Sequence, residues 1–361
     1  MSAGSSTRAL LAAALVLSAG CADTLVGPTA SATRAEVFDE VWRGVDLHYS
    51  FFEYKQINWD SVGAHYRPLA LAAPTDAQFA VVLSQMLREL KDVHVSLTPV
   101  GTASTTRYVS SSDTARTYFT MDLVTRQYVV NTRFTTGGHI RYGTAEPTVG
   151  YVRISSFAGG SWASEMDEAL DRMADVKTII VDVRDNSGGQ YKLAASIAGR
   201  FTDRSRTFGY VRYRNGPDHG DFTGYVGETV EPAGPRQFTG RVFVLTNRRD
   251  FSSAEDFVLA MRVNPNVSIV GDTTAGASGG PIVRELPNGW TYQVSEWIEY
   301  TPERQMFEGI GLVPDVLVPS TFADAGRGID AALERSIDLA TDGALTAKGI
   351  AGAAANRRTR P

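Results

Sequence analysis

Ser252 lies where the chain is best arranged for nucleophilic chemistry. The apolar run at residues 242–245 predicts a buried strand, and the polar residues 247–250 predict a turn. Residues 252–255 read Ser-Ser-Ala-Glu, a pattern typical of the box that caps the first turn of a helix. A serine on such a turn exposes its hydroxyl beside free N–H groups and the positive end of the helix dipole. That environment suits an attacking hydroxyl and a developing oxyanion, although the pattern is equally compatible with a Ser252 that only caps the helix.

His94 is the second candidate, because it lies at a predicted junction between a helix and a strand. The helix predicted from Thr75 ends near residue 90, and residues 93–97 alternate apolar and polar side chains as a strand does. Such a junction can direct a side chain into a cleft, where a histidine with an ordinary pKa of about 6.5 can act as a general base. A structural role is the alternative. The other four histidines include no pair with the spacing of metal ligands.

A glycine pair, Gly188-Gly189, follows a second predicted buried strand at residues 178–183. Glycine lets a backbone approach a ligand closely because it has no side chain. The segment is not a phosphate-binding loop, since no Gly-Lys-Ser/Thr sequence follows it. A tight turn into the helix predicted at residues 191–201 is the structural alternative.

Strands and helices alternate across residues 149–341, and this alternation predicts an α/β domain. The predicted strands cover residues 150–154, 178–183, 242–245, 267–270 and 292–300, and the predicted helices cover residues 162–173, 191–201, 252–261 and 328–340. A Leu-Pro-Asn-Gly turn at residues 286–289 predicts a hairpin. The Ala- and Arg-rich residues 342–361 predict a disordered tail.

Residues 34–99 have apolar side chains at helical spacing and predict a helical domain that packs on the α/β domain. Asp60 and Thr75 are the predicted caps of two of its helices. Residues 100–148 predict a small β-segment, to which no function is assigned. Its predicted strands cover residues 118–123 and 127–131.

The composition is that of a soluble globular protein, with 43% hydrophobic and 21% charged residues. A length of 361 residues allows one large or two modest domains. The net charge of -5 and the lack of a basic block in the body argue against nucleic-acid binding.

Residues 1–20 have the form of an export signal. Arg8 precedes a short apolar core, and Leu-Ser-Ala-Gly leads into Cys21, the only cysteine in the chain. This ending resembles the lipobox of bacterial lipoproteins, with the leucine one place further from the cysteine than usual. We therefore expect a periplasmic protein, held at a membrane (the outer membrane is favoured) by a lipid on Cys21, with residues 21–33 as a tether. An ordinary cleaved signal followed by an incidental cysteine is the alternative.

Five motifs, in order along the chain, resemble those of the S41 serine peptidases, the family of C-terminal processing (tail-specific) and tricorn-type proteases. The motifs are IIVDVRDNSGG, VFVLTNRRDFSSAEDF, IVGDTTAG, LPNG and FEGIGLVPD. The resemblance covers residues 34–340. It implies an α/β fold with a spiral ββα core, like that of the crotonase and ClpP superfamily. It also implies hydrolysis of peptide bonds, with Ser252 as the nucleophile.

The chain departs from the processing-protease branch in the loop after IVGDTTAG. That branch has a lysine base there, whereas residues 276–280 read Gly-Ala-Ser-Gly-Gly. The tricorn-like branch uses a histidine and a glutamate instead, and the matching positions are His94 and Glu308. Tricorn also has a serine directly before its histidine, where this chain has Val93. Whether Ser96 or another hydroxyl substitutes for that serine is left open.

The resemblance thus implies an exported serine endopeptidase in which His94 takes the proton of Ser252 and Glu308 orients the imidazole. The oxyanion would be bound by the backbone N–H of Ser253 and by that of Gly188 or of its neighbour Gly189. This mechanism requires no metal and no organic cofactor. The expected partner is a polypeptide substrate, and the number of subunits is not predicted.

Two alternatives remain at this point. The chain could be a catalytically inactive ligand- or peptide-binding protein on the same scaffold, although such a protein has no need of all three proposed catalytic residues. It could also be a crotonase-like enzyme acting on thioesters, but no stretch resembles a coenzyme A site. Residues 100–148 lack the carboxylate-binding glycine loop of a PDZ domain, so docking of substrate tails is not expected.

Overall fold

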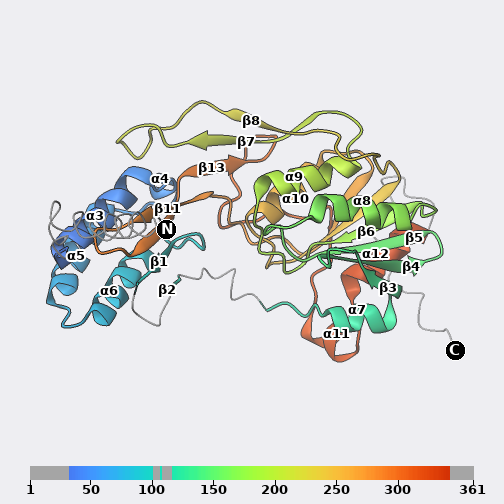
Figure 1. Cartoon of the computed structure of the whole chain (residues 1–361), viewed down its shortest axis with the longest axis horizontal. Helices are drawn as coiled ribbons and strands as arrows, with labels where there is room; N and C mark the ends of the chain where they lie inside the picture. The colour runs from blue at the N-terminus through green and yellow to red at the C-terminus, as the bar shows by residue number, and fades with distance from the viewer. Residues whose placement is uncertain (1–31, 101–105, 108–115, 342–361) are drawn as a thin grey trace, which may run out of the picture.

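The computed structural model describes residues 32–100, 106–107 and 116–341. Figure 1 shows the N-terminal helices on one side, a mixed α/β body on the other, and the β7–β8 hairpin running across the top of both. Among the described residues, no helix is long and apolar enough to cross a membrane. The predicted export signal, Cys21 and the predicted tail lie outside the described residues.

A seven-stranded sheet forms the centre of the α/β body, in the order β14-β10-β9-β6-β5-β4-β3. Its strands are β3 (Val130–Phe134), β4 (Ile140–Glu146), β5 (Val149–Ile154), β6 (Thr178–Asp182), β9 (Arg241–Thr246), β10 (Val267–Gly271) and β14 (Val316–Leu317). Strands β5, β6, β9, β10 and β14 are parallel, whereas β4 and β3 add an antiparallel edge. Because β6 and β9 are parallel neighbours, with Asp182 opposite Leu245, the segments that leave their carboxyl ends lie side by side. Those segments contain the glycine pair and Ser252.

Helices cover both faces of this sheet (Figure 1). One face packs against α8 (Trp162–Arg172), α9 (Tyr191–Ala198) with its 3₁₀ extension η1 (Gly199–Phe201), and α10 (Ser253–Arg262), and the other against α7 (Met121–Gln127) and α12 (Ala331–Thr341). A short helix, α11 (Phe322–Gly326), precedes α12. Along β9, Val242 and Val244 enter the first core, while Phe243 and Leu245 enter the second. This burial on both faces explains the continuous apolar runs in the sequence and confirms the predicted α/β class.

The N-terminal helices share a core with a four-stranded sheet. Two of its strands directly follow the helices, and the other two come from residues 281–295. The helices are α3 (Arg34–His48), α4 (Phe52–Lys55), α5 (Trp59–Ala72) and α6 (Asp76–Arg88), and the sheet, in the order β11-β12-β1-β2, consists of β1 (Ser96–Thr98), β2 (Thr106–Arg107), β11 (Pro281–Glu285) and β12 (Thr291–Ser295). Leu97 pairs with Tyr292, and both side chains are buried among those of the helices. The hairpin predicted at residues 286–289 therefore joins the N-terminal body instead of the α/β body.

Several predicted boundaries were wrong. The strand predicted at residues 292–300 breaks at Glu296 into β12 and β13 (Trp297–Tyr300), because the N–H and C=O of Glu296 bond to Gly280 and Arg214. β13 then belongs to a third sheet, β13-β7-β8, with β7 (Arg206–Tyr213) and β8 (Val226–Val230).

Three further predictions, two at the edge of the large sheet and one in the N-terminal body, also need correction. The strand predicted at residues 118–123 is replaced by α7, whose N-cap Thr120 accepts a hydrogen bond from the Leu123 N–H. The second strand predicted in that region starts later, as β3. Helix α5 is capped by the side chain of Asn58, so Asp60 lies within its first turn. Thr75 caps α6 as predicted.

Candidate active site

Ser252 lies on a sharp turn between β9 and α10, in the segment 247–252 that we call the elbow. Its backbone has φ 58° and ψ -137°, a conformation that a residue with a side chain seldom adopts. Such a conformation costs about 1–3 kcal/mol and persists only where the surroundings impose it. The Ser252 N–H donates to the carbonyl oxygen of Ala277 at 3.1 Å, which helps to hold the turn.

The capping box predicted for residues 252–255 is wrong. Ser252 occupies the N-cap position of α10, but its hydroxyl makes no capping hydrogen bond. The carboxylate of Glu255 instead accepts from Thr274 Oγ1 and from the N–H groups of Gly276 and Ala277, the latter two at 2.8 Å. Glu255 thus ties the loop after β10 to the helix, and the Ser252 hydroxyl is not used to cap it.

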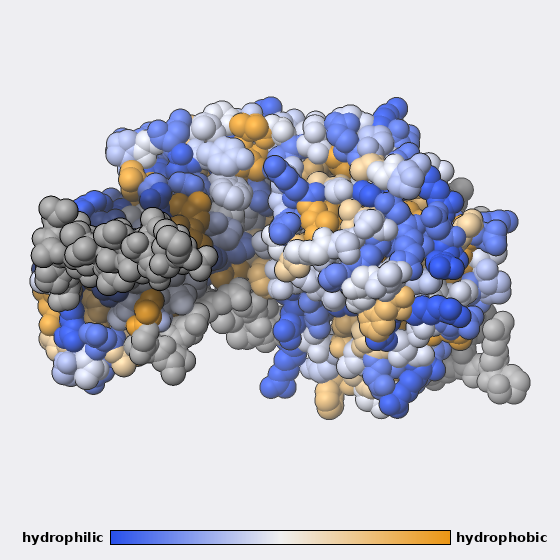
Figure 2. All heavy atoms as spheres, viewed as in Figure 1, coloured by the Kyte–Doolittle hydropathy of each residue, from blue (hydrophilic) through white to orange (hydrophobic). Residues whose placement is uncertain are grey.

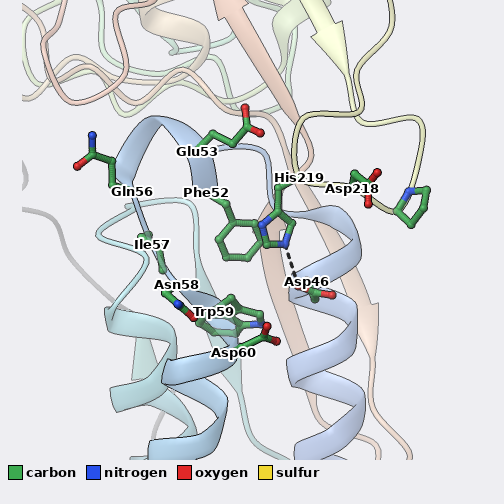
Figure 3. A pocket seen from close by; sticks show the side chains of 11 residues that line it. Asp46, Phe52, Glu53, Gln56, Ile57, Asn58, Trp59, Asp60, Asp218 and His219 are labelled. Atoms are coloured by element: carbon green, nitrogen blue, oxygen red, sulfur yellow. Dashed lines mark hydrogen bonds and ion pairs between the residues drawn. The ribbon is translucent and has the colours of Figure 1, made fainter.

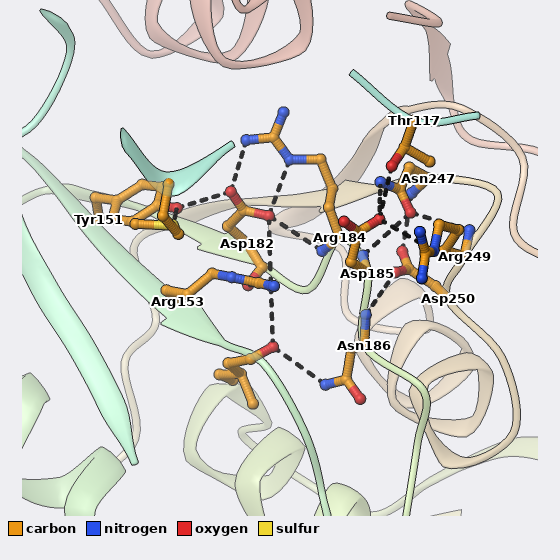
Figure 4. Close-up of polar contacts among 12 residues, drawn as sticks. Thr117, Tyr151, Arg153, Asp182, Arg184, Asp185, Asn186, Asn247, Arg249 and Asp250 are labelled. Atoms are coloured by element: carbon orange, nitrogen blue, oxygen red, sulfur yellow. Dashed lines mark hydrogen bonds and ion pairs between the residues drawn. The ribbon is translucent and has the colours of Figure 1, made fainter. Parts of the chain in front are cut away.

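A buried polar network fixes the elbow against the segment that follows β6 (Figure 4). The Asp250 carboxylate accepts from the N–H of Asn247 at 2.8 Å and from the N–H of Asn186 at 3.2 Å. The N–H of Phe251 donates to the carbonyl of Asn186, whose side-chain amide donates to Ile154. The segment after β6 and the elbow are therefore joined by hydrogen bonds to both the N–H and the carbonyl of Asn186.

Asp182 and Arg184, in the IIVDVRDNSGG motif, belong to the base of the same network. Arg184 donates to both oxygens of Asp182 and, at 2.7 Å, to Asp330. Tyr151 donates to Asp182 at 2.7 Å. All four side chains are buried, so this group stabilises the end of β6 and leaves no atom of Asp182 or Arg184 at a substrate surface.

The glycine pair packs directly against the elbow. A Cβ atom added to Gly188, which has φ 82°, would lie 2.8 Å from both Ser252 Cβ and Ser253 N, so only glycine fits here. The Gly188 N–H donates to Asn186 Oδ1 at 2.8 Å. The N–H groups of Gly189 and Ser253 have no hydrogen-bond partner among the described residues, and Ser253 Oγ donates to the Gly189 carbonyl at 3.0 Å. Of the two glycines predicted for the oxyanion hole, Gly189 is therefore the one with an available donor.

His94 lies between α6 and β1, as predicted, and its side chain is buried. Its ring meets the ring of Phe251 edge-on, with centroids 6.2 Å apart. Val93 and Phe251, the residues directly before His94 and Ser252, belong to one small buried cluster together with Ala275 and Ala277. The structure thus brings the segments of the predicted base and nucleophile together, although 158 positions separate the two residues.

Asp92 holds the backbone of His94. Its Oδ1 accepts from the His94 N–H at 2.8 Å and lies 4.0 Å from His94 Nδ1, while its Oδ2 accepts from Ser295 Oγ at 2.9 Å. Gln293 donates to the His94 carbonyl at 2.9 Å. The histidine is consequently held by Asp92, in the segment between α6 and β1, and by β12.

Glu308 is buried at the other side of the loop after β10. Its Oε2 accepts from the N–H of Ser278 at 2.9 Å and from Ser278 Oγ at 3.1 Å, and its Oε1 accepts from Lys55 Nζ at 2.9 Å. Burial raises the pKa of Glu308, and the nearby Asp92 carboxylate adds to the rise, whereas Lys55 acts in the opposite direction. The hydroxyl beside Glu308 is thus that of Ser278, while Ser96 lies in β1 opposite Gln293.

Lys55, Asp92 and Glu308 form what we call the charge cluster, since Lys55 Nζ also lies 3.8 Å from Asp92 Oδ2. Sequence reasoning missed Lys55, Asp92 and Ser278. Asp92, two residues before His94, and Ser278, in the loop where the processing-protease branch has its lysine, could have been found from their positions in the motifs. Lys55 had no such signal, because it belongs to a four-residue helix.

A separate pocket of about 620 Å³ lies beside α4 (Figure 3). Phe52 stacks on His219 with ring centroids 4.1 Å apart, and His219 Nε2 bonds to Asp46 Oδ1 at 2.8 Å. The pocket contains none of the predicted site residues. Its lining comes from α3, α4, the start of α5 and the β7–β8 loop, and comprises Asp46, Phe52, Glu53, Gln56, Ile57, Asn58, Trp59, Asp60, Pro217, Asp218 and His219.

Comparison with known proteins relates this chain to peptidases. Residues 148–318 match the model of peptidase family S41, and residues 30–88 match that of the tricorn protease C1 domain. A solved structure described as a putative peptidase from Parabacteroides merdae is 30% identical, with a TM-score of 0.78, over 87% of this chain and 100% of that chain.

Two curated relatives are similar over about half of the chain. The carboxy-terminal processing protease CtpA of Bacillus subtilis is 27% identical over 172 residues, and the chloroplastic carboxyl-terminal-processing peptidase 2 of Arabidopsis thaliana is 26% identical over 183 residues. These matches cover 46% and 50% of this chain, but only 34% of each relative. The chain therefore spans about a third of the length of the curated relatives it matches.

Proposed function

This chain belongs to peptidase family S41, and on that premise we propose that it is a serine endopeptidase that cleaves polypeptides with Ser252 as its nucleophile. The main support is the elbow. The Ser252 hydroxyl lies on a strained turn and makes no capping hydrogen bond. The glycine pair packs against this turn through Gly188, and the N–H groups of Gly189 and Ser253 have no partner among the described residues. Such a combination of a positioned hydroxyl and free donors suits acyl transfer.

In the proposed reaction, His94 accepts the hydroxyl proton of Ser252 while the serine oxygen attacks the carbonyl carbon of the peptide. The N–H groups of Gly189 and Ser253 bind the oxygen that becomes negative. The protonated imidazole then gives its proton to the leaving amine, and an acyl-enzyme forms. Water then attacks the acyl carbon while His94 takes a proton from it. His94 gives that proton to the Ser252 oxygen as the second product leaves.

Two carboxylates supply the third part of the mechanism: Asp92, which lies beside His94, and Glu308, which Lys55 links to Asp92. Glu308 is our candidate for the carboxylate that stabilises the charged imidazole, together with Asp92, which holds the histidine backbone. Their negative charges favour proton uptake by His94 during attack. In this arrangement the general base is a histidine, so the loop at residues 276–280 has no need of a lysine.

The proposal is tested with a fluorophosphonate probe and with an unfolded casein substrate. Wild-type protein should be labelled and should cleave casein, and Ser252→Ala should lose both. Ser164→Ala is the matched control, because Ser164 is exposed on α8 and bonds only to its own helix turn. Undiminished casein cleavage by Ser252→Ala would contradict the nucleophile assignment. No labelling and no cleavage by the wild type, together with tight peptide binding, would support the inactive binding protein instead.

We propose in addition that the protein is exported and anchored through a lipid on Cys21, a proposal that rests on the sequence of residues 1–33. In a bacterial expression host, Cys21→Ser should move the protein from the membrane fraction to the soluble fraction. Mass spectrometry of the mature N-terminus should find the lipid on Cys21. An unmodified cysteine, or cleavage at another site, would contradict this proposal.

A further inference from the structure

Lys55 is the one positive side chain in the charge cluster, and its surroundings are unusual for a lysine. Only 12% of its side chain is exposed. Its Nζ donates to Glu308 Oε1 at 2.9 Å, to the Tyr49 hydroxyl at 2.9 Å and to the Lys91 carbonyl at 3.1 Å. An ammonium group has three N–H donors, so these three oxygens match its capacity.

Two aromatic rings and a neighbouring tyrosine add to the contacts around the Lys55 ammonium. Nζ lies 5.0 Å from the ring centre of Phe51 and 5.6 Å from that of Tyr49. The neighbouring Tyr54 donates its hydroxyl proton to the Glu308 carbonyl at 3.0 Å. Two consecutive residues of α4 therefore grip the same glutamate, one at its carboxylate and one at its backbone.

The cluster needs this cation, because it brings two buried carboxylates together. Asp92 and Glu308 are 1% and 3% exposed, and the charge of Asp92 acts to keep Glu308 protonated. A buried carboxylate without a positive partner is expensive and takes up a proton. Lys55 is within 4 Å of both, so it is the positive charge that offsets the repulsion between them.

We propose that Lys55 is a positioning residue of the catalytic centre, which holds Asp92 and Glu308 as a pair of carboxylates beside His94. The proposal rests on the serine-peptidase function proposed above. It also means that the N-terminal helical region is a working part of the active site, since α4 supplies this residue. Lys55 itself touches no substrate and acts through Glu308 and Asp92.

The pH dependence of catalysis is the most specific consequence. Tyr49, Asp92 and Glu308 face the Lys55 ammonium from the segment after α3, the segment after α6 and the loop before β14, and behind them lie His94 beside Asp92 and Glu255 beside Glu308. Without the cation, Glu308 holds its proton up to a higher pH, because Lys55 is the charge that lowers its pKa. The acid limb of the kcat profile should then move to higher pH, while binding of substrate changes little.

The experiment compares Lys55→Met with Lys177→Met, an exposed lysine in the loop between α8 and β6. For Lys55→Met, kcat on casein should fall roughly 10- to 100-fold, within the coupling energies known for ionic networks, with KM near that of the wild type. Its acid limb should lie at higher pH. Lys177→Met should match the wild type in all three measurements.

A double-mutant cycle separates positioning from a merely structural role. If Lys55 acts through Glu308 and Asp92, adding Lys55→Met to Glu308→Gln should lower kcat by clearly less than Lys55→Met does in the wild type, because one of the two partner charges is already absent. Fully additive losses, or a Lys55→Met profile with the wild-type kcat and acid limb, would overturn the inference while leaving Ser252→Ala inactive. Failure of the proposed function itself would appear separately, as undiminished cleavage by Ser252→Ala.

Circular dichroism and thermal unfolding show whether Lys55→Met is folded. If it is not, Lys55→Arg decides the question, because it keeps the charge but changes the donor geometry. A reduced kcat with the acid limb at the wild-type pH supports the proposal. A Lys55→Arg variant with an acid limb at higher pH despite its charge overturns it.

Discussion

The elbow and the charge cluster lie close together but are built in opposite ways. The elbow is one continuous stretch of chain, held mainly by backbone groups and by the close fit of Gly188. The charge cluster joins side chains from three distant parts of the chain, and Lys55 and Glu308 are 253 residues apart. In the elbow, close packing fixes the backbone around Ser252. In the charge cluster, attraction between Lys55 and two carboxylates fixes the charged side chains. Variants of the first should therefore lower the rate equally at every pH, and variants of the second should change the pH profile.

Gly188→Ala should have the largest effect among the variants that test this difference. The added methyl group would lie 2.8 Å from Ser252 Cβ and Ser253 N and would displace the elbow from the oxyanion donors. We expect kcat to fall roughly 10²- to 10³-fold, as for loss of an oxyanion donor, with the shape of the pH profile unchanged. Steady-state cleavage of casein across pH 5–9 measures both.

Gly138→Ala is the matched control. Gly138 has a similar φ of 79°, but an added Cβ would meet nothing within 4 Å. This variant should lose only about 1–2 kcal/mol of stability, from the backbone strain alone, and keep its kcat. An equal loss of activity in both variants would show that strain, and not the contact with the elbow, is responsible.

Ser278→Ala tests the cluster side of the comparison. It removes the hydroxyl that donates to Glu308 Oε2 but keeps the Ser278 N–H. Since a hydrogen bond to a charged group contributes about 1.5–3 kcal/mol, a loss of about tenfold in kcat is expected, together with an acid limb at higher pH.

Ser295→Ala is its counterpart at Asp92, where it removes a hydroxyl that donates to Oδ2. We expect a smaller loss of kcat there, because we assign the stabilisation of the imidazole to Glu308 and the holding of the His94 backbone to Asp92. A larger loss of kcat in Ser295→Ala than in Ser278→Ala would instead assign the stabilisation of the imidazole to Asp92. It would leave the elbow part of the mechanism unchanged.

The pH dependence of stability should give the smallest effect and should be separable from that of catalysis. Glu228 on β8, Asp256 in the first turn of α10 and Glu299 on β13 lie close together behind the elbow. Burial, with a contribution from Asp256, raises the pKa of Glu228 to about 8, and burial raises that of Asp256 to about 6. The folded state therefore keeps protons that the unfolded state releases above pH of about 4–4.5. The free energy of unfolding should fall as pH rises from about 4.5 to about 8.

Glu228→Gln should flatten the upper part of that fall, because an amide cannot lose the proton. The measurement is the midpoint of urea unfolding at several pH values between 5 and 8.5. Glu231→Gln, at an exposed position just after β8, is the control and should follow the wild-type curve. If Glu228→Gln also follows it, the carboxyl at position 228 is not protonated in the folded protein.

The sequence predicted the parts of this protein that depend on local patterns. The strands β6 and β9 were predictable because both faces of the sheet are covered, so that their residues are apolar without interruption. The division of the segment at residues 292–300 into two strands at Glu296 was not predictable. Its alternating pattern continues through both β12 and β13, and only the pairing with Gly280 and Arg214 sends the two halves into different sheets.

For the candidate site, the order of the motifs determined the family and pointed to Ser252, His94 and Glu308. The sequence alone suggested that the Ser252 hydroxyl caps a helix, because the Ser-Ser-Ala-Glu pattern is a local signal. Only the tertiary structure showed that Glu255 binds the loop at residues 274–277 and that the Ser252 hydroxyl makes no capping hydrogen bond. The position of Lys55 was likewise decided by folding alone. Charged side chains pair through space, and the sequence of α4 does not indicate that Lys55 will contact Glu308, 253 residues away.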